Sequence, residues 1–402
     1  MYYSFKSVLC MSCMMVCIFC VETRAQEEQK QELVKIKRVP MRPLTDNVKL
    51  TDEKLEASIR KGVDFLVKDQ NANGSWGSVT RTKSLNIYAP LPGAHHAFRM
   101  GTSCLALTGL LESGDERPEV KDAIARAEAW FLKNLPRLKR ADVTTTYNVW
   151  GHGYALQALA ALATREGITE EQKEVYKQVA QGQLDALVRY QDIDGGWGYY
   201  SSIATDRPSG GSNCFTTAAV LTGVYDCQQV FDLTLPEKRL KLGVKSIQMQ
   251  RNPDFTYNYA FGHIYYPRNR INRPGGSLAR SQSCNAALRL YGDTKVTDEV
   301  ITTWLDKLVK RNGWLDIGRK RPVPHETHFA VSGYFYYFGH YYAARCIEMI
   351  PEEQQLEWKN KLGLIILDKQ ESDGSWWDFP LYDYHQPYGT GFALSILNRC
   401  RK

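Results

Sequence analysis

The hydrophobic pattern of this chain predicts a series of helix pairs. Six stretches place apolar residues at the three-to-four-residue spacing of an amphipathic helix. Each is followed by a second stretch that is richer in small and apolar residues. The second stretches begin near Gly101, Tyr147, Gly211, Leu278, Phe329 and Tyr388. The chain is therefore predicted to be all-α, with six helix pairs between residues 55 and 402.

Three of the first helices share one ending. Each ends at a glutamine, and a tryptophan follows six residues later, preceded by glycine and a small residue. The pairs are Gln70 with Trp76, Gln191 with Trp197, and Gln370 with Trp376. Glycine and Asn or Asp between them are typical of a helix C-terminus. The glutamine can bond exposed helix-end groups, and the tryptophan can pack on the neighbouring unit, so we expect both to be structural.

Three weaker copies complete the set. The helix over 245–250 is followed by Phe255 in place of tryptophan, the helix ending at 308–311 is followed by Trp314, and the helix over 120–135 lacks such an ending. Aligned on a small residue, all six second helices carry a polar residue one position earlier. These are Ser103, His152, Asn213, Ser283, Ser332 and Thr390. They indicate either a polar ring around a cavity mouth or the ordinary preference of helix starts for such residues.

The six pairs predict a single α6/α6 toroid, with two concentric rings of six helices. Outer helices would carry the charged faces, and inner helices would contact their neighbours and a central cavity. An open solenoid of six pairs is the alternative.

The glutamine–tryptophan pattern resembles the QW repeat of squalene and oxidosqualene cyclases, and it is similar to the repeats of protein prenyltransferase β subunits. The resemblance covers about residues 55–402 and implies the toroid fold of the terpenoid cyclase and prenyltransferase superfamily. It says less about activity, because one fold hosts unrelated sites.

The chemical motifs of these relatives are altered here. Squalene–hopene cyclases carry Asp-x-Asp-Asp followed by Thr-Ala, whereas residues 213–216 read Asn-Cys-Phe-Thr. The Asp-x-Cys zinc ligands of the prenyltransferases correspond to Gln282 and Cys284 with an intervening serine. We therefore expect neither metal nor cofactor. Another acid would be needed, and Asp316, Asp378 or a protonated histidine are candidates.

The N-terminus suggests export. Residues 1–25 combine a charged start, a short apolar core and a small residue at position 25, which is typical of a cleaved signal peptide. An uncleaved membrane anchor is the alternative, and residues 26–54 read as a linker or surface arm. No other apolar run is long enough to span a bilayer. The net charge of +7 is scattered, so no nucleic-acid-binding patch is visible.

Histidines mark one end of the predicted toroid. Seven of the eight precede or open a second helix: His95, His96, His152, His263, His325, His328 and His385. All connections from an outer to an inner helix emerge at the same end of such a fold. We therefore expect a site at that end, where imidazoles can transfer protons near neutral pH.

Specific roles follow from this placement. We expect His152 or His328 to abstract a proton, Tyr334 or Tyr147 to donate one, and Asn213 to assist. The residues expected to bind the substrate are His95, His96, Asn148, Trp150, Tyr154, His325 and Tyr337. His325 and His328 also allow a zinc site with a third histidine, although the motif is short.

Three kinds of function remain open. The first is an exported enzyme that acts in the cavity on an apolar, isoprenoid-like molecule, and the second is a lyase-like enzyme for acidic polysaccharides. The third is a non-catalytic toroid that binds a small molecule, a lipid-like ligand or a peptide. Apolar cavity walls would favour the first, and an open groove rich in arginine would favour the second. The candidate arginines are Arg268, Arg270, Arg273 and Arg280.

Overall fold

The computed structural model describes residues 49–140, 142, 145–200, 211–326, 328 and 330–401. The predicted signal peptide, residues 1–25, and most of the predicted arm lie outside these residues. The described part is helical, and its only extended pairings are four isolated β-bridges. The prediction of an all-α protein is confirmed.

Twelve of the described helices form two rings. The outer ring consists of α2 (Asp52–Asp69), α4 (Pro118–Asn134), α6 (Glu170–Tyr190), α8 (Glu237–Gln250), α10 (Asp298–Lys310) and α13 (Glu352–Leu367). The inner ring consists of α3 (Gly93–Ser113), α5 (Asn148–Thr164), α7 (Cys214–Phe231), α9 (Pro274–Leu290), α12 (Phe335–Ile347) and α14 (His385–Arg399). A short helix, α11 (Asn312–Asp316), lies between α10 and α12.

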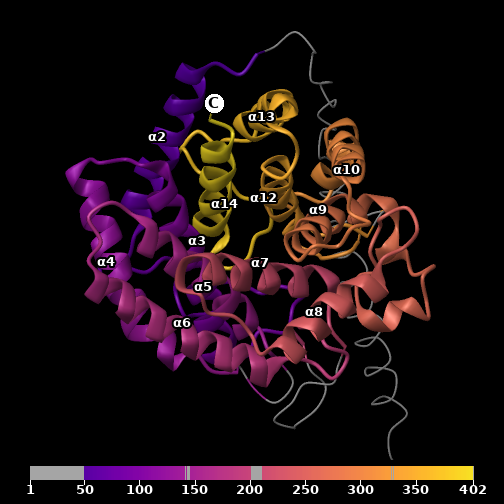
Figure 1. Ribbon diagram of the computed structural model, residues 1–402. Helices are drawn as coiled ribbons and strands as arrows, with labels where there is room; N and C mark the ends of the chain where they lie inside the picture. Colours follow the sequence, from indigo (N-terminus) through magenta and orange to yellow (C-terminus); the bar gives the residue numbers. More distant parts are fainter. Residues whose placement is uncertain are drawn as a thin grey trace, which may run out of the picture. The chain divides into compact units, whose positions relative to one another are not determined.

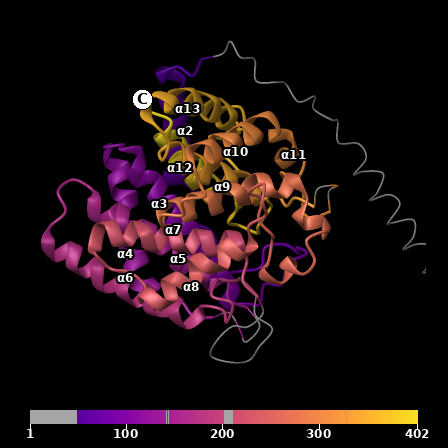
Figure 2. The ribbon, with the colours of Figure 1, turned by 45° about the vertical axis from the view of Figure 1, so that its right-hand side comes forward.

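The inner ring is closed. Each inner helix packs on the next, and α14 packs on α3, so that the last pair meets the first (Figures 1 and 2). Glu112 of α3 and Arg399 of α14 support this closure with two bonds of 2.7 and 2.8 Å. The predicted α6/α6 toroid is therefore confirmed, and the alternative of an open solenoid is wrong.

Burial follows the two rings. In α5, fourteen of the seventeen residues are buried, because this inner helix has neighbours on every side. In α2, six of the eighteen residues are buried, and they form the apolar stripe of an amphipathic helix. The more polar helices of the sequence therefore form the outer ring, and the more apolar helices form the inner ring.

The three glutamine–tryptophan loops fasten neighbouring pairs. Each indole N–H donates to a carbonyl in the preceding outer helix, at Leu66, Leu187 and Ile366, over 2.8–2.9 Å. Each glutamine side chain donates to a carbonyl of the neighbouring outer helix, at Ala123, Arg239 and Ser58 respectively. All three tryptophans are fully buried. Their geometry matches a structural role.

The fourth copy of the loop is shifted by two residues from the predicted one. Tyr257, not Phe255, takes the buried position of the tryptophan, and its hydroxyl donates to Asn285 over 2.8 Å. Phe255 occupies the position of the loop glycine and has a φ of 60°, as Gly74, Gly195 and Gly374 have positive φ. The repeat correctly predicts a buried aromatic residue in this loop, but the prediction named Phe255 and the structure shows Tyr257 in that position.

Candidate functional site

The six loops that lead from outer to inner helices meet at one end of the ring. Each loop contacts the next, and the last contacts the first. The contacts are Tyr88 with Asp142, Thr145 with Tyr200, Ser212 with Phe261, Arg270 with His325, Lys320 with Asp378, and Tyr384 with Ser78. The loops therefore surround a single opening, as the connectivity of a toroid predicts.

A cavity of about 310 Å³ lies inside the inner ring at this end. Thirteen of its 22 described lining residues are phenylalanine, tyrosine or tryptophan. The aromatic residues are Phe98, Tyr147, Trp150, Tyr154, Tyr199, Tyr200, Phe215, Tyr334, Phe335, Phe338, Phe379, Tyr388 and Phe392. The described lining contains no Asp, Glu, Lys or Arg. Its volume is at the lower end of the roughly 300–1,000 Å³ typical of small-molecule sites.

A histidine and a tyrosine form the polar edge of the cavity. His325 Nδ1 lies 2.7 Å from the carbonyl of Ala330, so this nitrogen carries the proton and donates it. His325 Nε2 is then free to accept from the Tyr334 hydroxyl, which lies 3.0 Å away. Burial lowers the pKa of His325, which keeps the imidazole neutral near pH 7. The pair combines a base with a bound phenol, which can relay a proton.

The loop that carries His325 is held by two arginines. Arg270 donates to the carbonyl of His325 and Arg273 to that of His328, each over 2.6 Å. His325 itself has a φ of 61°, a conformation that side chains other than glycine rarely adopt. The arginines thus fix the backbone that turns the imidazole toward the cavity.

Arg280 is fully buried behind this edge. Its Nε donates to the carbonyl of Tyr257 over 3.2 Å, and one terminal nitrogen donates to the carbonyl of Ile271 over 2.9 Å. The guanidinium also lies 5.7 Å from the ring centre of Tyr259. Arg280 is enclosed, so it does not contribute to the open arginine groove that would favour a polysaccharide lyase, whereas Arg268, Arg270 and Arg273 are exposed.

Two segments of the wall meet at a buried carboxyl group. Asp378 accepts from the hydroxyl of Tyr388, a lining residue, and from the backbone N–H of Tyr337 over 3.0 Å. The second bond caps the start of α12. Burial raises the pKa of Asp378 to about 7, with these hydrogen bonds and Arg319 acting in the opposite direction.

Five of the residues predicted for the site line the cavity. They are Tyr147, Trp150, Tyr154, His325 and Tyr334. The phenylalanines of the wall were not predicted individually; they are Phe98, Phe215, Phe335, Phe338, Phe379 and Phe392. The spacing of Phe335 and Phe338 places both on one face of α12. That spacing was the available signal, although it could not show which side of the helix faced inward.

His152 and Asn148 do not face the cavity. His152 Nδ1 lies 2.7 Å from the side-chain oxygen of Gln183 on α6, and its Nε2 lies 3.3 Å from Asn148 Nδ2. Both residues are buried between the inner and the outer ring. The expectation that His152 abstracts a proton from a ligand and that Asn148 binds it is corrected, because Gln183 and Asn148 occupy both ring nitrogens.

The other predicted residues also lie outside the cavity lining. His95 is fully buried with Nδ1 3.0 Å from the Tyr384 hydroxyl, while His96 and His328 are exposed. Asn213 donates to the carbonyl of Tyr259 over 3.2 Å. Tyr337 is fully buried and donates its backbone N–H to Asp378. The prediction that these five residues contact a ligand in the cavity is therefore corrected. Side chains at a helix start point in all directions, and these five point elsewhere.

The predicted polar ring has a structural explanation at two of its positions. Ser103 and Thr390 accept the backbone N–H groups of Trp76 and Trp376, over 3.1 and 3.0 Å. In α7 the equivalent acceptor for Trp197 is Thr217, at 2.9 Å, not Asn213. Alignment on Cys214 was therefore shifted by four residues, about one helical turn.

Acid should destabilise the protein through His152. Burial lowers its pKa to about 4, below the roughly 6.5 of an unfolded chain. The stability that neutral His152 contributes is fully present above about pH 6.5 and is lost as pH falls toward 4, by up to about 1.4 kcal/mol per pH unit. Denaturant unfolding at pH 7 and pH 5 should show a smaller difference for His152→Gln than for the unsubstituted protein. An unchanged difference would contradict this assignment.

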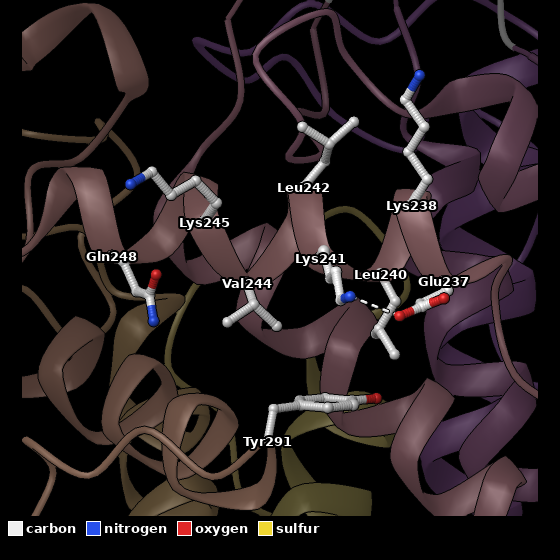
Figure 3. A pocket seen from close by; sticks show the side chains of 9 residues that line it. All are labelled: Glu237, Lys238, Leu240, Lys241, Leu242, Val244, Lys245, Gln248 and Tyr291. Atoms are coloured by element: carbon white, nitrogen blue, oxygen red, sulfur yellow. Dashed lines mark hydrogen bonds and ion pairs between the residues drawn. The ribbon is translucent and has the colours of Figure 1, made fainter.

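A second hollow lies on the outer surface. It is a groove of about 730 Å³ lined by α8 and by Tyr291, which follows α9. Figure 3 shows Lys241 paired with Glu237 beside Leu240 and Val244. The groove shares no lining residue with the central cavity. Its three lysines are exposed, and Tyr291 is the one aromatic residue of its described lining.

The described residues contain no cluster of three or more His, Cys, Asp or Glu side chains suited to a metal ion. Among them, no helix combines the length and apolar character that crossing a bilayer requires.

Comparisons with known proteins agree on the fold. A cellobiose 2-epimerase from Spirochaeta thermophila has a TM-score of 0.52 at 14% identity, over 87% of this chain and 97% of its own. A cellobiose 2-epimerase from Bacillus thermoamylovorans has a TM-score of 0.55 at 13% identity, over 86% and 100%. A protein described as a novel alpha-amylase, from Clostridium perfringens, has a TM-score of 0.53 at 12% identity, over 86% and 98%. At such identities the likeness concerns the fold alone.

The sequence itself points to one family. No protein with a curated description matches it. The squalene-hopene cyclase C-terminal domain matches residues 40–259, which is more than half of the chain. This match covers two of the three glutamine–tryptophan loops, those of Trp76 and Trp197. The chain therefore belongs to the squalene-hopene cyclase C-terminal domain family, within the superfamily that its repeats resemble.

Proposed function

We propose that the protein is an enzyme that binds a compact, mainly apolar, isoprenoid-like molecule in its central cavity. The observation that carries the proposal is the aromatic wall of the cavity, whose polar edge is the His325–Tyr334 pair. Burying apolar ligand surface against such a wall is favourable, and the few polar groups can orient the ligand. His325 acts as the base, and Tyr334 holds or donates the proton.

Cavity binding is best tested by filling the space. Gly101 lines the cavity, and a Cβ atom there would meet no atom closer than 3.9 Å. Gly101→Leu should therefore leave the fold intact but exclude the ligand. The matched control is Gly182→Leu, since Gly182 is an exposed residue of α6 with no atom within 4 Å of such a Cβ.

The probe is geraniol, a ten-carbon isoprenoid alcohol, titrated by calorimetry. We expect binding to the unsubstituted protein and to Gly182→Leu, and a loss of at least tenfold in affinity for Gly101→Leu with unchanged circular dichroism. Equal affinity of both variants would show that geraniol binds elsewhere. Cellobiose is the comparison ligand, because two of the similar structures are named for it. Tight binding of cellobiose in place of geraniol would favour a carbohydrate substrate.

The polar edge gives a second prediction. Tyr334→Phe keeps the ring but removes the hydroxyl that can accept from the geraniol O–H. One hydrogen bond contributes about 0.5–1.5 kcal/mol, so we expect geraniol to bind roughly 3–10-fold more weakly. Calorimetry at pH 7 measures this difference. If geraniol binds equally well to both proteins, its alcohol does not lie at the His325–Tyr334 edge.

We also propose export, which the charged start and short apolar core of residues 1–25 support. N-terminal sequencing of protein recovered from the producing cells should begin at Gln26. A start at Met1 in a membrane fraction would favour the alternative of an N-terminal anchor.

A further inference from the structure

The aromatic cavity has an electrostatic character as well as an apolar one. The faces of aromatic rings carry partial negative charge and attract cations, most strongly where water is excluded. Trp150, Phe215 and Phe338 form a contiguous cluster with ring centres 6.1–6.2 Å apart. Phe335 extends it toward Tyr334, with ring centres 5.0 Å apart. No described lining residue carries a positive side chain that would occupy these faces.

A carboxyl group without an ion pair lies directly behind this wall. Asp378 is fully buried, and its carboxyl group accepts from the Tyr388 hydroxyl and from the backbone N–H groups of Tyr337 and Phe379. Arg319 is the nearby cation, but its Nε bonds Asp316 at 2.7 Å, and Asp316 also pairs with Lys369. Among the described residues, none forms a salt bridge with Asp378. The carboxylate thus has donors to hold it, while Arg319 acts on it without a direct salt bridge.

We propose that the ligand of this cavity carries a positive charge, as an organic ammonium ion, and that Asp378 supplies the countercharge through Tyr388. The proposal rests on the proposed function, namely that the cavity binds a small molecule, and it adds the ligand's charge. Tyr388 would contact the ligand with its ring, while Asp378 acts through it as a positioning residue.

Binding should then be linked to a proton. With a pKa raised to about 7 by burial, Asp378 is close to half-protonated at neutral pH in the empty protein. A cation in the cavity favours the carboxylate and lowers this pKa, so binding releases a proton. Affinity for a cation should consequently rise with pH through about 7 and level off above it.

Other titratable groups around Asp378 lie outside this window. Burial raises the pKa values of Tyr337 on α12 and Tyr388 on α14, so both stay neutral. Arg319, in the loop before α12, has its pKa raised and stays charged. His325, across the wall, has its pKa lowered by burial. Protonation of His325 would therefore oppose a cation only at more acidic pH.

The probes are choline and 3,3-dimethyl-1-butanol, which have the same shape and differ in charge. Calorimetry on the full chain from pH 5.5 to 8.5 should give at least tenfold tighter binding of choline at pH 8. Its affinity should rise at least fivefold from pH 6 to pH 8, with proton release measured in buffers of different ionisation enthalpy. Equal affinity for the two probes overturns the inference, whereas geraniol binding lost in Gly101→Leu would still support the proposed function.

Variants separate Asp378 from other carboxylates. Asp378→Asn should abolish the pH dependence of choline binding and the proton release. Asp383→Asn, an exposed carboxylate five residues away, should behave like the unsubstituted protein. A pH dependence that persists in Asp378→Asn, or disappears in Asp383→Asn, overturns the role of Asp378.

A second variant tests the role of Asp378 even if Asp378→Asn does not fold. Tyr388→Phe keeps the ring that faces the cavity and removes the hydrogen bond that lowers the pKa of Asp378. The rise in choline affinity should therefore move to higher pH. An unmoved midpoint overturns the link through Tyr388.

Discussion

Replacing Trp197 by alanine should lower the free energy of unfolding by about 3–5 kcal/mol. The indole is fully buried, so its removal leaves a cavity between α6, α7 and α8. The carbonyl of Leu187 also loses the 2.8 Å hydrogen bond from the indole N–H. Gly243 of α8 shows how closely the ring is packed, because a Cβ there would lie 2.9 Å from the indole. Urea unfolding monitored by circular dichroism measures the loss.

The control for this variant is Tyr266→Ala. Tyr266 is 73% exposed, and substitutions of such side chains usually change stability by less than about 0.5 kcal/mol. Ligand affinity should remain unchanged in both variants under conditions in which they are folded. If Trp197→Ala kept its stability but lost ligand binding, the tryptophan would belong to the site and not to the scaffold.

Gly391→Ala should destabilise the protein by about 1–3 kcal/mol, in the range of overpacked cores. Gly391 lies on α14 where it packs on α3, and a Cβ there would lie 2.5 Å from the carbonyl oxygen of Leu105. The obstructing atoms belong to the backbone of another helix, so no side chain can rotate to make room. The substitution therefore pushes α14 away from α3 at the point where the ring closes. Thermal and urea unfolding measure the effect.

Gly182→Ala should have the opposite effect on stability. This residue also lies inside a helix, but nothing surrounds its Cβ position. Alanine is favoured over glycine in a helix by about 0.5–1 kcal/mol, so this variant should be slightly more stable. If Gly391→Ala and Gly182→Ala destabilised the protein equally, the close packing of α14 on α3 would not be the cause.

The sequence predicted the scaffold well because the scaffold repeats. Glutamine and tryptophan at a fixed spacing have one geometric solution, in which Gln70 reaches Ala123 of the next outer helix and Trp76 reaches back to Leu66. Three copies of the same solution specify a ring. Where the repeat is degenerate, the prediction failed locally, as at Tyr257, because a loop conformation with positive φ was carried by Phe255 instead of glycine.

The site was predicted less well because it depends on side-chain direction. His152 and His325 both lie at the end where the loops meet, yet His152 turns toward Gln183 of the outer ring and His325 toward the cavity. Inner helices are buried on all sides, so their sequences carry no polar stripe that marks the inward face. The positive φ of His325 could not be predicted either, because sequence patterns indicate this conformation mainly at glycine.

Closure of the ring also means that packing does not require the chain to start at any particular helix pair. Glu56 near the start of α2 bonds Arg401 just after α14, and Ser58 bonds Gln370, so early and late segments are direct neighbours. Joining residue 401 to residue 49 and opening the chain between α6 and α5, at the exposed Gly167, would preserve every contact within the rings. Such a circular permutant should fold to the same toroid, with its chain ends between α5 and α6, and its circular dichroism and ligand affinity should match those of the unsubstituted protein.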